Sequence, residues 1–247
     1  MLYVTSGQKV VEEKDIVNTE GKHKVQMARL PRYGNTETSI TVHKEIPLNR
    51  EFGHFIGMYI GDGWCDKNSN GIYIASIDER IKDFFIKCVN TYLRDSHVNG
   101  YKKANTEHEF EGYTSVHGKA CMYINNGIRD AMINTFGHGA GNKRLPQEML
   151  NGNKEFKYGL LYGLLDADGS VSYRDVLKKG KMQQNKNVMY STISPELAIN
   201  IQDICLSLGI YTSITTTNRK GTVEYTLVMS TVGIYALRNE IQTIGEN

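Results

Sequence analysis

Two aspartates at equivalent points of the chain, Asp62 and Asp168, could together bind a divalent cation. Each ends a helix-like segment and is followed by a glycine. The dipole at a helix C-terminus disfavours a carboxylate by roughly 0.3–1 kcal/mol, so an acid placed there twice indicates a compensating partner. Two neighbouring carboxylates repel each other, whereas Mg²⁺ prefers oxygen ligands and keeps several waters. The pair therefore predicts a Mg²⁺ site suited to phosphodiester hydrolysis by metal-activated water.

Small residues before each aspartate could bring the two together. Gly57 and Gly61 are one helical turn apart in the first segment, and Gly163 and Ala167 are one turn apart in the second. Small residues at this spacing clear one face of a helix, so that two helices pack with their backbones nearly touching. We therefore predict two parallel helices, related by a pseudo-twofold axis, that place the aspartates side by side. The glycine after each aspartate suits a left-handed helix end.

The two segments belong to an internal repeat. Each is followed by an alternating, strand-like stretch and then by a helix start, at Asp78 in the first copy and at Ser194 in the second. Both residues are favoured N-caps, and Pro195 sits at the favoured first helical position. Farther on, Gly127 matches Gly233 at the spacing set by the aspartates. A single Asp-Gly often marks only a turn, but its recurrence within a duplication favours the metal site.

The repeat predicts an α+β fold of two pseudo-symmetric αββαββα units whose sheets form a saddle. We place the first unit at residues 49–152 and the second at 153–247, and treat the polar, turn-rich residues 1–48 as an accessory segment. The accessory segment contains short possible strands at Lys9–Val11 and Lys24–Met27. Within the repeats, the predicted strands and closing helices are Ile72–Ile77, Met122–Asn125, Ile128–Phe136, Val188–Ile193, Tyr225–Met229 and Ile234–Ile244.

The composition is that of a soluble globular protein. The 247 residues are 40% hydrophobic and 23% charged, which excludes a mainly disordered chain. No run approaches 18 apolar residues, so we expect no membrane span. The four cysteines are scattered without a C-x-x-C pair, which argues against a zinc knuckle or a disulfide scaffold and favours an intracellular setting. A net charge of +2 neither requires nor excludes a nucleic-acid partner.

The aspartate segments resemble a known signature. Leu161–Gly169, LYGLLDADG, closely resembles the motif of the LAGLIDADG homing endonucleases, and Phe55–Gly63 resembles a looser copy that departs at Ile60 and Gly61. The resemblance covers about residues 50–247. It implies a monomeric, single-chain enzyme with two motifs, which acts inside the cell on double-stranded DNA. The two sheets would lie over the major groove of a long recognition site.

The resemblance also implies roles for residues of the motifs. Asp62 and Asp168 would be the catalytic acids and, together with the neighbouring Gly61 and Ala167, the metal-binding residues. The cofactor would be Mg²⁺, for which Mn²⁺ could substitute. Asp166 matches the inner acid of the motif, which in the family is more structural than catalytic.

A basic residue is expected in the loop before the second motif helix, where the family tends to have one. Lys143, within Asn142–Pro146, occupies that place and would stabilise the transition-state phosphate or polarise the nucleophilic water. The alternative is a solvated surface lysine. A counterpart at the repeat spacing would fall beyond Asn247, which leaves cleavage of both strands open. Lys119 and Lys220, before equivalent strands, are further candidates.

Hairpins of the repeats concentrate side chains that contact DNA. The richest is Tyr173–Lys186, and the loops Thr215–Lys220 and Tyr101–Lys103 are similar. Arg and Gln can read guanine and adenine edges, and Lys can contact phosphates. For any one of these residues, a solvated position is an equally good explanation. The predicted DNA-binding residues are Arg174, Lys179, Lys181, Gln183, Gln184, Lys186, Arg219, Lys220, Lys102, Lys103 and Lys119.

Three weaker features complete the interpretation. Gly137–Lys143 lacks the order of a phosphate-binding loop, and we interpret it as a flexible connector. Trp64 is expected to pack beneath the site. Residues Val4–Ile16 faintly resemble part of an intein splicing domain, which suggests descent from an intein.

Two other functions remain as alternatives to the endonuclease. The first is a non-cleaving nucleic-acid-binding relative, such as an intron maturase. The second is a protein-interaction module that binds no DNA.

Overall fold

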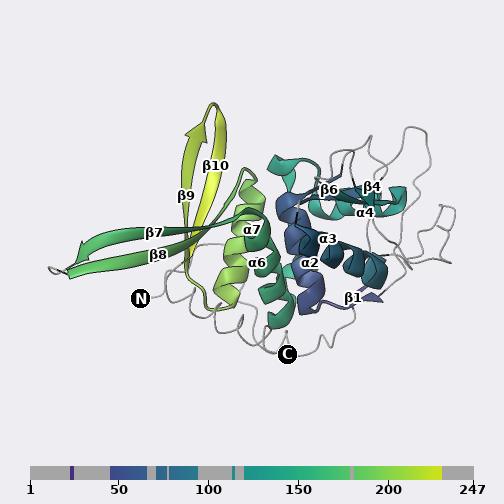
Figure 1. The fold of residues 1–247 in the computed structure, drawn as a ribbon, viewed down its shortest axis with the longest axis horizontal. Coiled ribbons are helices and arrows are strands. Elements are labelled where there is room, and N and C mark those ends of the chain that lie inside the picture. Colours follow the sequence, from purple (N-terminus) through teal and green to yellow (C-terminus); the bar gives the residue numbers. More distant parts are fainter. Residues whose placement is uncertain are drawn as a thin grey trace.

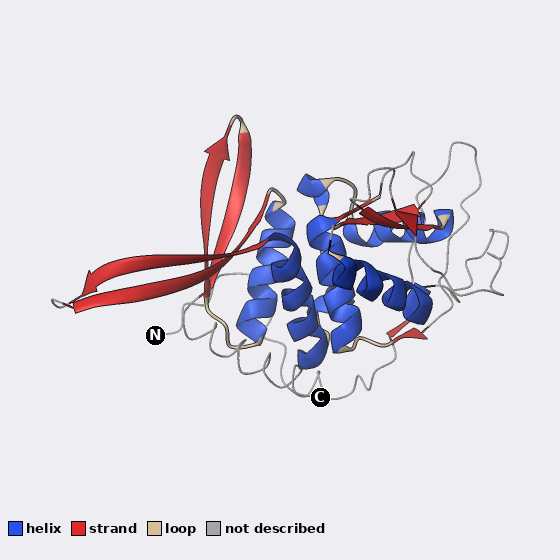
Figure 2. Cartoon of the chain, in the orientation of Figure 1, coloured by secondary structure: helices blue, strands red, loops and turns tan. Residues whose placement is uncertain are grey.

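The structure is a computed structural model in which two similar α+β halves lie on either side of a central pair of helices (Figure 1). Strands lie at both sides of the molecule and helices lie between them (Figure 2). The C-terminal strands form two long hairpins that project from the helical body. The structure describes residues 23–24, 45–65, 71–76, 78–93, 113–114, 120–178 and 181–229.

The first half contains the predicted order of helix, two strands, helix, two strands and closing helix. A π-helical turn (Val89–Leu93) extends its middle helix. The elements are α2 (Arg50–Asp62), β3 (Gly63–Trp64), β4 (Gly71–Ala75), α3 (Glu79–Cys88), β5 (Tyr113–Thr114), β6 (Ala120–Ile124) and α4 (Asn126–Phe136).

The second half repeats this order up to its last strand. The predicted closing helix Ile234–Ile244 and the predicted strand Lys9–Val11 lie outside the described residues. The elements are α6 (Lys154–Asp168), β7 (Gly169–Lys178), β8 (Lys181–Thr192), α7 (Pro195–Ser207), β9 (Thr212–Arg219) and β10 (Thr222–Met229).

Short elements precede and connect the halves. In the accessory segment, β1 (His23–Lys24) pairs antiparallel with β2 (Glu45–Ile46), close to the predicted strand at Lys24–Met27. Between the halves lie a 3₁₀ turn, Ala140–Asn142, and the one-turn helix α5 (Gln147–Leu150). The connector is therefore built from two helical turns.

Both sheets have four antiparallel strands in the same relative order. The first runs β3-β4-β6-β5 and the second β7-β8-β10-β9. In each, the first strand begins at the residue that follows a motif helix, so the sheets flank the paired ends of α2 and α6. The prediction of an α+β fold with duplicated halves is confirmed.

Polar caps fix where the helices begin. Asp78 and Ser194 are the N-caps of α3 and α7, as predicted, and Pro195 is the first residue of α7. The motif helices have a matched pair of caps that the sequence analysis missed. The side chains of Asn49 and Asn153 accept hydrogen bonds from the backbone N–H three residues on, at 2.8 and 2.9 Å. Each cap satisfies a donor that the helix itself leaves unpaired.

The motif helices α2 and α6 pack backbone against backbone. A Cβ added at Gly57 would lie 2.2 Å from the carbonyl oxygen of Leu160, and one at Gly163 would lie 2.0 Å from that of His54. Such distances leave no room for a methyl group, so the predicted close packing is confirmed. Two further glycines, Gly53 and Gly159, extend the contact by one helical turn, with carbonyl oxygens 2.2 and 2.0 Å from their added Cβ atoms.

The prediction of left-handed helix ends at Gly63 and Gly169 is wrong. Gly63 has φ −87° and ψ 152°, and Gly169 has φ −72° and ψ 147°, both extended. Each motif helix therefore passes directly into a strand. Glycine is needed for a different reason, because a Cβ at these positions would lie 2.3 Å from the carbonyl oxygen of Tyr59 and 2.2 Å from that of Leu165.

The hydrophobic core runs through both halves. Phe52 of α2 and Phe156 of α6, both buried, have ring centroids 6.5 Å apart across the helix pair. Aromatic side chains also connect α2 to the rest of the first half, since the ring of Phe55 lies 5.9 Å from that of Phe85. No helix in the described part of the chain is both long and apolar enough to cross a membrane.

Candidate active site

Asp62 and Asp168 lie at the touching ends of the two motif helices. They are the last residues of α2 and α6, and a Cβ added at Gly61 would lie 2.3 Å from that of Ala167. Burial, and then the charge of Asp168, raise the pKa of Asp62, while the ammonium of Lys143 opposes the rise. The structure thus brings these five predicted residues together.

Lys143 enters the site from the connector and binds the end of α2. Its ammonium donates hydrogen bonds to the carbonyl oxygens of Ile60, Gly61 and Gly63, the last two at 3.1 Å each. These use the three protons of a lysine ammonium and satisfy carbonyls that a helix end leaves unpaired. Burial lowers the pKa of Lys143, and the carboxylates of Asp168 and Asp62 oppose that effect. The alternative of a solvated surface lysine is therefore wrong.

The connector holds Lys143 in place through contacts with the second half. The hydroxyl of the fully buried Ser194 donates to the carbonyl oxygen of Lys143 at 2.6 Å. Two residues on, the backbone N–H of Leu145 donates to the side chain of Asn200 at 2.9 Å. The connector is thus anchored on α7, while its lysine reaches α2 of the other half.

Two glycines allow the connector to turn toward the site. Gly137 and Gly139 have φ values of 88° and 76°, in the region that favours glycine. Beside them lies a cavity of about 240 Å³, lined by the aromatic residues Tyr59, Trp64 and Phe136. Trp64 is 42% exposed, so the prediction that it packs beneath the site is wrong. Trp64 lies in the two-residue strand β3, where it alternates with the buried Gly63, so its side chain is directed outward.

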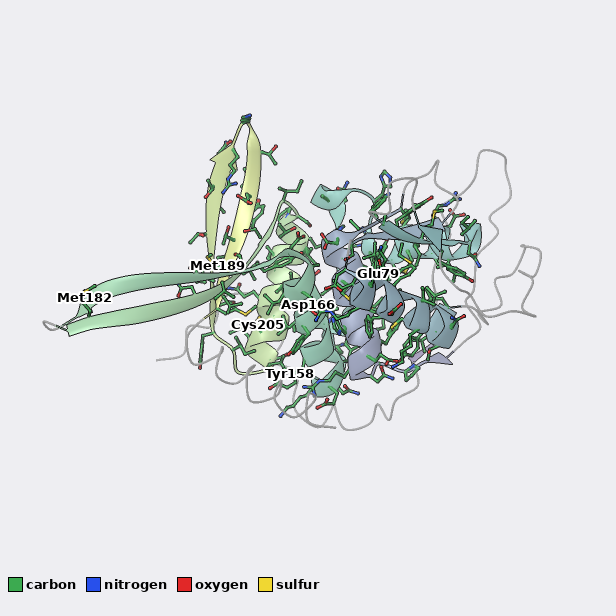
Figure 3. All side chains as sticks on the ribbon, viewed as in Figure 1. Glu79, Tyr158, Asp166, Met182, Met189 and Cys205 are labelled. Atoms are coloured by element: carbon green, nitrogen blue, oxygen red, sulfur yellow. The ribbon has the colours of Figure 1, made fainter. Side chains whose placement is uncertain are left out.

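The inner acid of the second motif connects the two halves. An oxygen of Asp166 lies 2.8 Å from Nε2 of His54 on α2, and the His54 ring lies 4.6 Å from that of Phe84. Figure 3 shows Asp166 near the middle of the helical body. This contact is a bridge between the motif helices, in keeping with the expected structural role.

Tyr190 of β8 is a neighbour of the carboxylates that the sequence analysis missed. It is buried, and after burial the charges of Asp168 and Asp62 are the next causes that raise its pKa. Its position within a predicted strand gave no sign of this proximity, which depends on how the second sheet crosses the end of α6.

Strand register divides the predicted DNA-binding residues of the β7–β8 hairpin. Arg174 pairs with Asn185 and Gln183 pairs with Val176, while Gln184 pairs with Asp175. Successive residues of a strand alternate between faces, so positions 174, 181 and 183 share one face and positions 184 and 186 share the other. The buried Tyr190 lies on the same face of β8 as positions 184 and 186. Arg174, Lys181 and Gln183 are therefore at positions on the face opposite to the buried Tyr190, which we call the open face, and Gln184 and Lys186 are at positions on the same face as Tyr190.

The remaining DNA-binding candidates divide between the second hairpin and undescribed residues. Arg219, at the end of β9, forms an ion pair with Glu224 of β10 at 3.0 Å. Lys220 is exposed in the turn between the two strands, with φ 52°. The candidates that lie outside the described residues are Lys102, Lys103, Lys119 and Lys179.

Comparison with known proteins agrees with this arrangement. The family model described as a LAGLIDADG-like domain matches residues 155–242, which include most of the second repeat. The second repeat belongs to the LAGLIDADG family. The predicted family is therefore confirmed for this repeat, and the first repeat is the pseudo-symmetric copy with the looser motif.

Curated relatives of this LAGLIDADG chain are much longer proteins. It is 30% identical over 171 residues to the ATP-dependent DNA helicase Hel308 of Thermococcus kodakarensis, with 68% of the chain and 14% of the helicase covered. It is 26% identical over 136 residues to the DNA-directed RNA polymerase subunit Rpo1C of Methanocaldococcus jannaschii, with 53% and 14% covered. The alignments therefore span about a seventh of each relative.

A solved structure of the family has the same fold. A mesophilic variant of the homing endonuclease I-DmoI is 14% identical to this chain, with a TM-score of 0.50. The alignment covers 77% of this chain and 94% of the other. The LAGLIDADG chain thus has a homing endonuclease-like fold across both of its repeats.

Proposed function

We propose that this chain is a monomeric, site-specific endonuclease that hydrolyses phosphodiester bonds of double-stranded DNA with a divalent metal ion. One observation carries the proposal: α2 and α6 pack so closely that Asp62 and Asp168 end side by side. The two sheets flank these carboxylates, so a duplex lying across both sheets would pass over them. The family relationship and the homing endonuclease-like fold support the same activity.

The residues at the paired helix ends fit a hard divalent cation. Carboxylates are ligands that Mg²⁺ prefers, and the charge of Asp168 makes ionisation of Asp62 less favourable. A cation would offset both this repulsion and the helix dipoles. Asp62 and Asp168 would hold it, with Gly61 and Ala167 alongside as the predicted further binding residues. When bound, the metal supplies an activated water and neutralises charge on the phosphate, and Mn²⁺ is expected to substitute for Mg²⁺.

Lys143 is proposed to position Asp62 and to supply positive charge at the site. Its hydrogen bonds to Gly61 and Gly63 come immediately before and after the aspartate in the chain. These hydrogen bonds fix the end of α2 and so hold Asp62 in one position, as catalysis by an oriented group requires. The ammonium also interacts with both carboxylates and so lowers the negative potential that a DNA phosphate would meet.

The open face of the second sheet is suited to the DNA major groove. Ser191 of β8 and Thr226 of β10 lie on this face, with their hydroxyl oxygens 2.9 Å apart. Arg174, Lys181 and Gln183 occupy positions of the same face along the β7–β8 hairpin. Hydroxyl, amide and guanidinium groups are the ones that read base edges in the major groove.

The sizes of the relatives support an origin within a longer protein. The chain matches about a seventh of a helicase and about a seventh of an RNA polymerase subunit, two proteins of different activity. A segment shared by such different proteins is expected of an insertion that moves between genes. We propose descent from such an element, of which an intein is one example.

A cleavage selection tests the proposed activity. The protein is incubated with Mg²⁺ and a plasmid library that carries a randomised segment, and linearised plasmids are sequenced to obtain the target. Asp62→Asn and Asp168→Asn should each reduce cleavage of that target by about 10³-fold, because a lost metal contact costs several kcal/mol. Asp83→Asn, at an exposed position of α3, is the matched control and should cleave normally.

The outcomes separate the proposed nuclease from its alternatives. Mg²⁺-dependent cleavage that survives either substitution would overturn the site. Tight binding of intron RNA without cleavage of any duplex would instead support the maturase. An absence of salt-dependent DNA binding would support an interaction module.

A further inference from the structure

The open face of the first sheet carries a row of paired strand positions that includes large side chains. Trp64 of β3 pairs with Tyr73 of β4, Tyr73 pairs with Met122 of β6, and Met122 pairs with Tyr113 of β5. These four positions form one cross-strand row that spans the whole sheet. The rings of Trp64 and Tyr73 are stacked, with centroids 5.0 Å apart and planes 13° apart.

Burial shows that this row faces away from the core. Ile72 and Ile74, which alternate with Tyr73 along β4, are 0% and 1% exposed and point into the core. Trp64 is 42% exposed, and Ile124 of β6, which shares the parity of Met122, is 49% exposed. Exposed large apolar residues gathered on one sheet face indicate a binding surface.

The second sheet has a different chemistry at the equivalent positions. Its matching row, read from the same strand pairings, is Ser170, Met189, Val228 and Ser213. Figure 3 shows Met189 at the base of the two hairpins, next to the helical body. Serines thus occupy the two edge positions of this row, where the first sheet has Trp64 and Tyr113.

The next row shows the same contrast. In the second sheet it contains Ser191, Thr226 and Thr215, all with hydroxyl groups. In the first sheet the row pairs Ala75 with Ala120. The second sheet therefore presents hydroxyl groups at Ser170, Ser191 and Thr226, where the first sheet presents Trp64, Ala75 and Ala120. At the centre of the first row both sheets are largely apolar, with Tyr73 and Met122 opposite Met189 and Val228.

We propose that the two sheets recognise their halves of the DNA target by different chemistry, with Trp64 and Tyr73 as specificity-determining residues for thymines. This inference rests on the proposed function. The thymine C5-methyl is the apolar group that base pairs present in the major groove. The first sheet selects a thymine-containing half-site by packing against these methyl groups, and the second sheet reads its half-site by hydrogen bonds. The two sheets flank the same carboxylates, so one duplex engages both.

Replacement of thymine by deoxyuridine tests the inference without altering the protein. Deoxyuridine keeps every hydrogen-bonding group of thymine and lacks the methyl. In the target recovered by the cleavage selection, thymines are replaced in one half at a time, and binding is measured by fluorescence anisotropy in EDTA. In one half, each buried methyl that is lost should weaken binding about fourfold. In the other half, the dissociation constant should stay within about twofold.

Two variants identify the sheet that is responsible. Trp64→Ala should bind the unmodified target more weakly and should lose most of its sensitivity to deoxyuridine in the sensitive half. Ser170→Ala, at the equivalent position of the second sheet, is the matched control and should keep that sensitivity. Thermal melting followed by circular dichroism confirms that both variants are folded.

Each outcome bears on the inference separately from the proposed function. If deoxyuridine has no effect in either half, or if Trp64→Ala keeps the full sensitivity, the inference is overturned while wild-type cleavage leaves the nuclease in place. If Trp64→Ala impairs binding of unpaired strands only, the row stacks on bases and the thymine assignment is wrong. If the protein cleaves no duplex, the proposed function fails first and the inference with it.

Discussion

The close contact between α2 and α6 predicts that Gly163→Ala lowers both the stability and the activity of the protein. A Cβ at this position would lie 2.0 Å from the carbonyl oxygen of His54 and 2.6 Å from the amide nitrogen of Met58. Both atoms belong to the backbone of the facing helix, so no side-chain rotation can relieve the overlap. Carbon and oxygen atoms need about 3.2 Å or more, and the helices must therefore separate by about 1 Å.

The expected loss of stability combines two effects of opposite sign. Overpacking of this kind costs about 3 kcal/mol, at the upper end of its usual range because backbone atoms clash. Replacement of glycine by alanine within a helix returns about 1 kcal/mol through helix propensity. The net loss is about 2 kcal/mol, and for a chain of this size it corresponds to a fall in melting temperature of about 4–8 °C.

The same separation should impair the proposed chemistry. Asp168 ends the helix that carries Gly163, so moving α6 changes the spacing of the two carboxylates. A displacement of about 1 Å at a catalytic group reduces the rate about 10²-fold. Gly57→Ala, whose Cβ would lie 2.2 Å from the carbonyl oxygen of Leu160, should behave alike.

Thermal denaturation and Mg²⁺-dependent cleavage of the selected target measure the two effects. Gly141→Ala is the matched control, because its Cβ would meet only Cδ1 of Ile193 at 3.9 Å and its backbone needs no glycine. It should change the unfolding free energy by less than about 0.5 kcal/mol. If Gly163→Ala melts at or above the wild-type temperature, helix propensity is the dominant effect and the close packing of the motif helices is refuted.

Three further predictions follow from single contacts. Ser194→Ala should lower the unfolding free energy in urea by about 1–2 kcal/mol, because α7 loses its N-cap and the carbonyl of Lys143 loses its hydrogen-bond donor; an unchanged midpoint would contradict the anchoring of the connector. Lys143→Met should reduce cleavage at least tenfold and destabilise the protein by about 1–3 kcal/mol, measured on the same samples, because buried carbonyls lose their donor; full activity would remove Lys143 from the site. Burial raises the pKa of Glu51, but hydrogen bonds from Lys87 and Tyr92 outweigh it and hold the pKa below its ordinary value of 4.5. The charged form therefore stabilises the fold above that pH, and the difference in melting temperature between wild type and Glu51→Gln should shrink as the pH falls below 4.5; a difference independent of pH would refute this.

Features that repeat in the sequence could be predicted from it. The spacing of Gly57 and Gly61, and of Gly163 and Ala167, indicated a close helix contact because only backbone approach explains small residues one turn apart. Asp78 and Ser194 marked equivalent helix starts because both are favoured N-cap residues at the same point of their repeats. These features depend on local chemistry and on comparison of one half with the other, both of which a single sequence contains.

Features that depend on a single three-dimensional arrangement could not be predicted. The sequence pointed to Lys143 through its place before the motif, but its carbonyl partners at Gly61 and Gly63 depend on how the connector crosses α2. Arg174 and Gln184 were equally good candidates for DNA contact by residue type, yet strand register places their positions on opposite faces of the sheet. A shift of register by one residue would exchange these assignments, and nothing local in the hairpin fixes it.

The duplicated fold makes the carboxylates nearly equivalent, and the single connector makes them different. Lys143 binds carbonyls at the end of α2, beside Asp62, and the connector that carries it is anchored on α7. A separate contact between the motif helices joins Asp166 of α6 to His54 of α2. The two strands of a bound duplex would therefore meet unequal surroundings. The two sheets add a second asymmetry, which suits a target whose halves differ in sequence. Under the proposed function, the duplication would supply the paired acids, and the differences between the two halves would distinguish one strand and one half-site from the other.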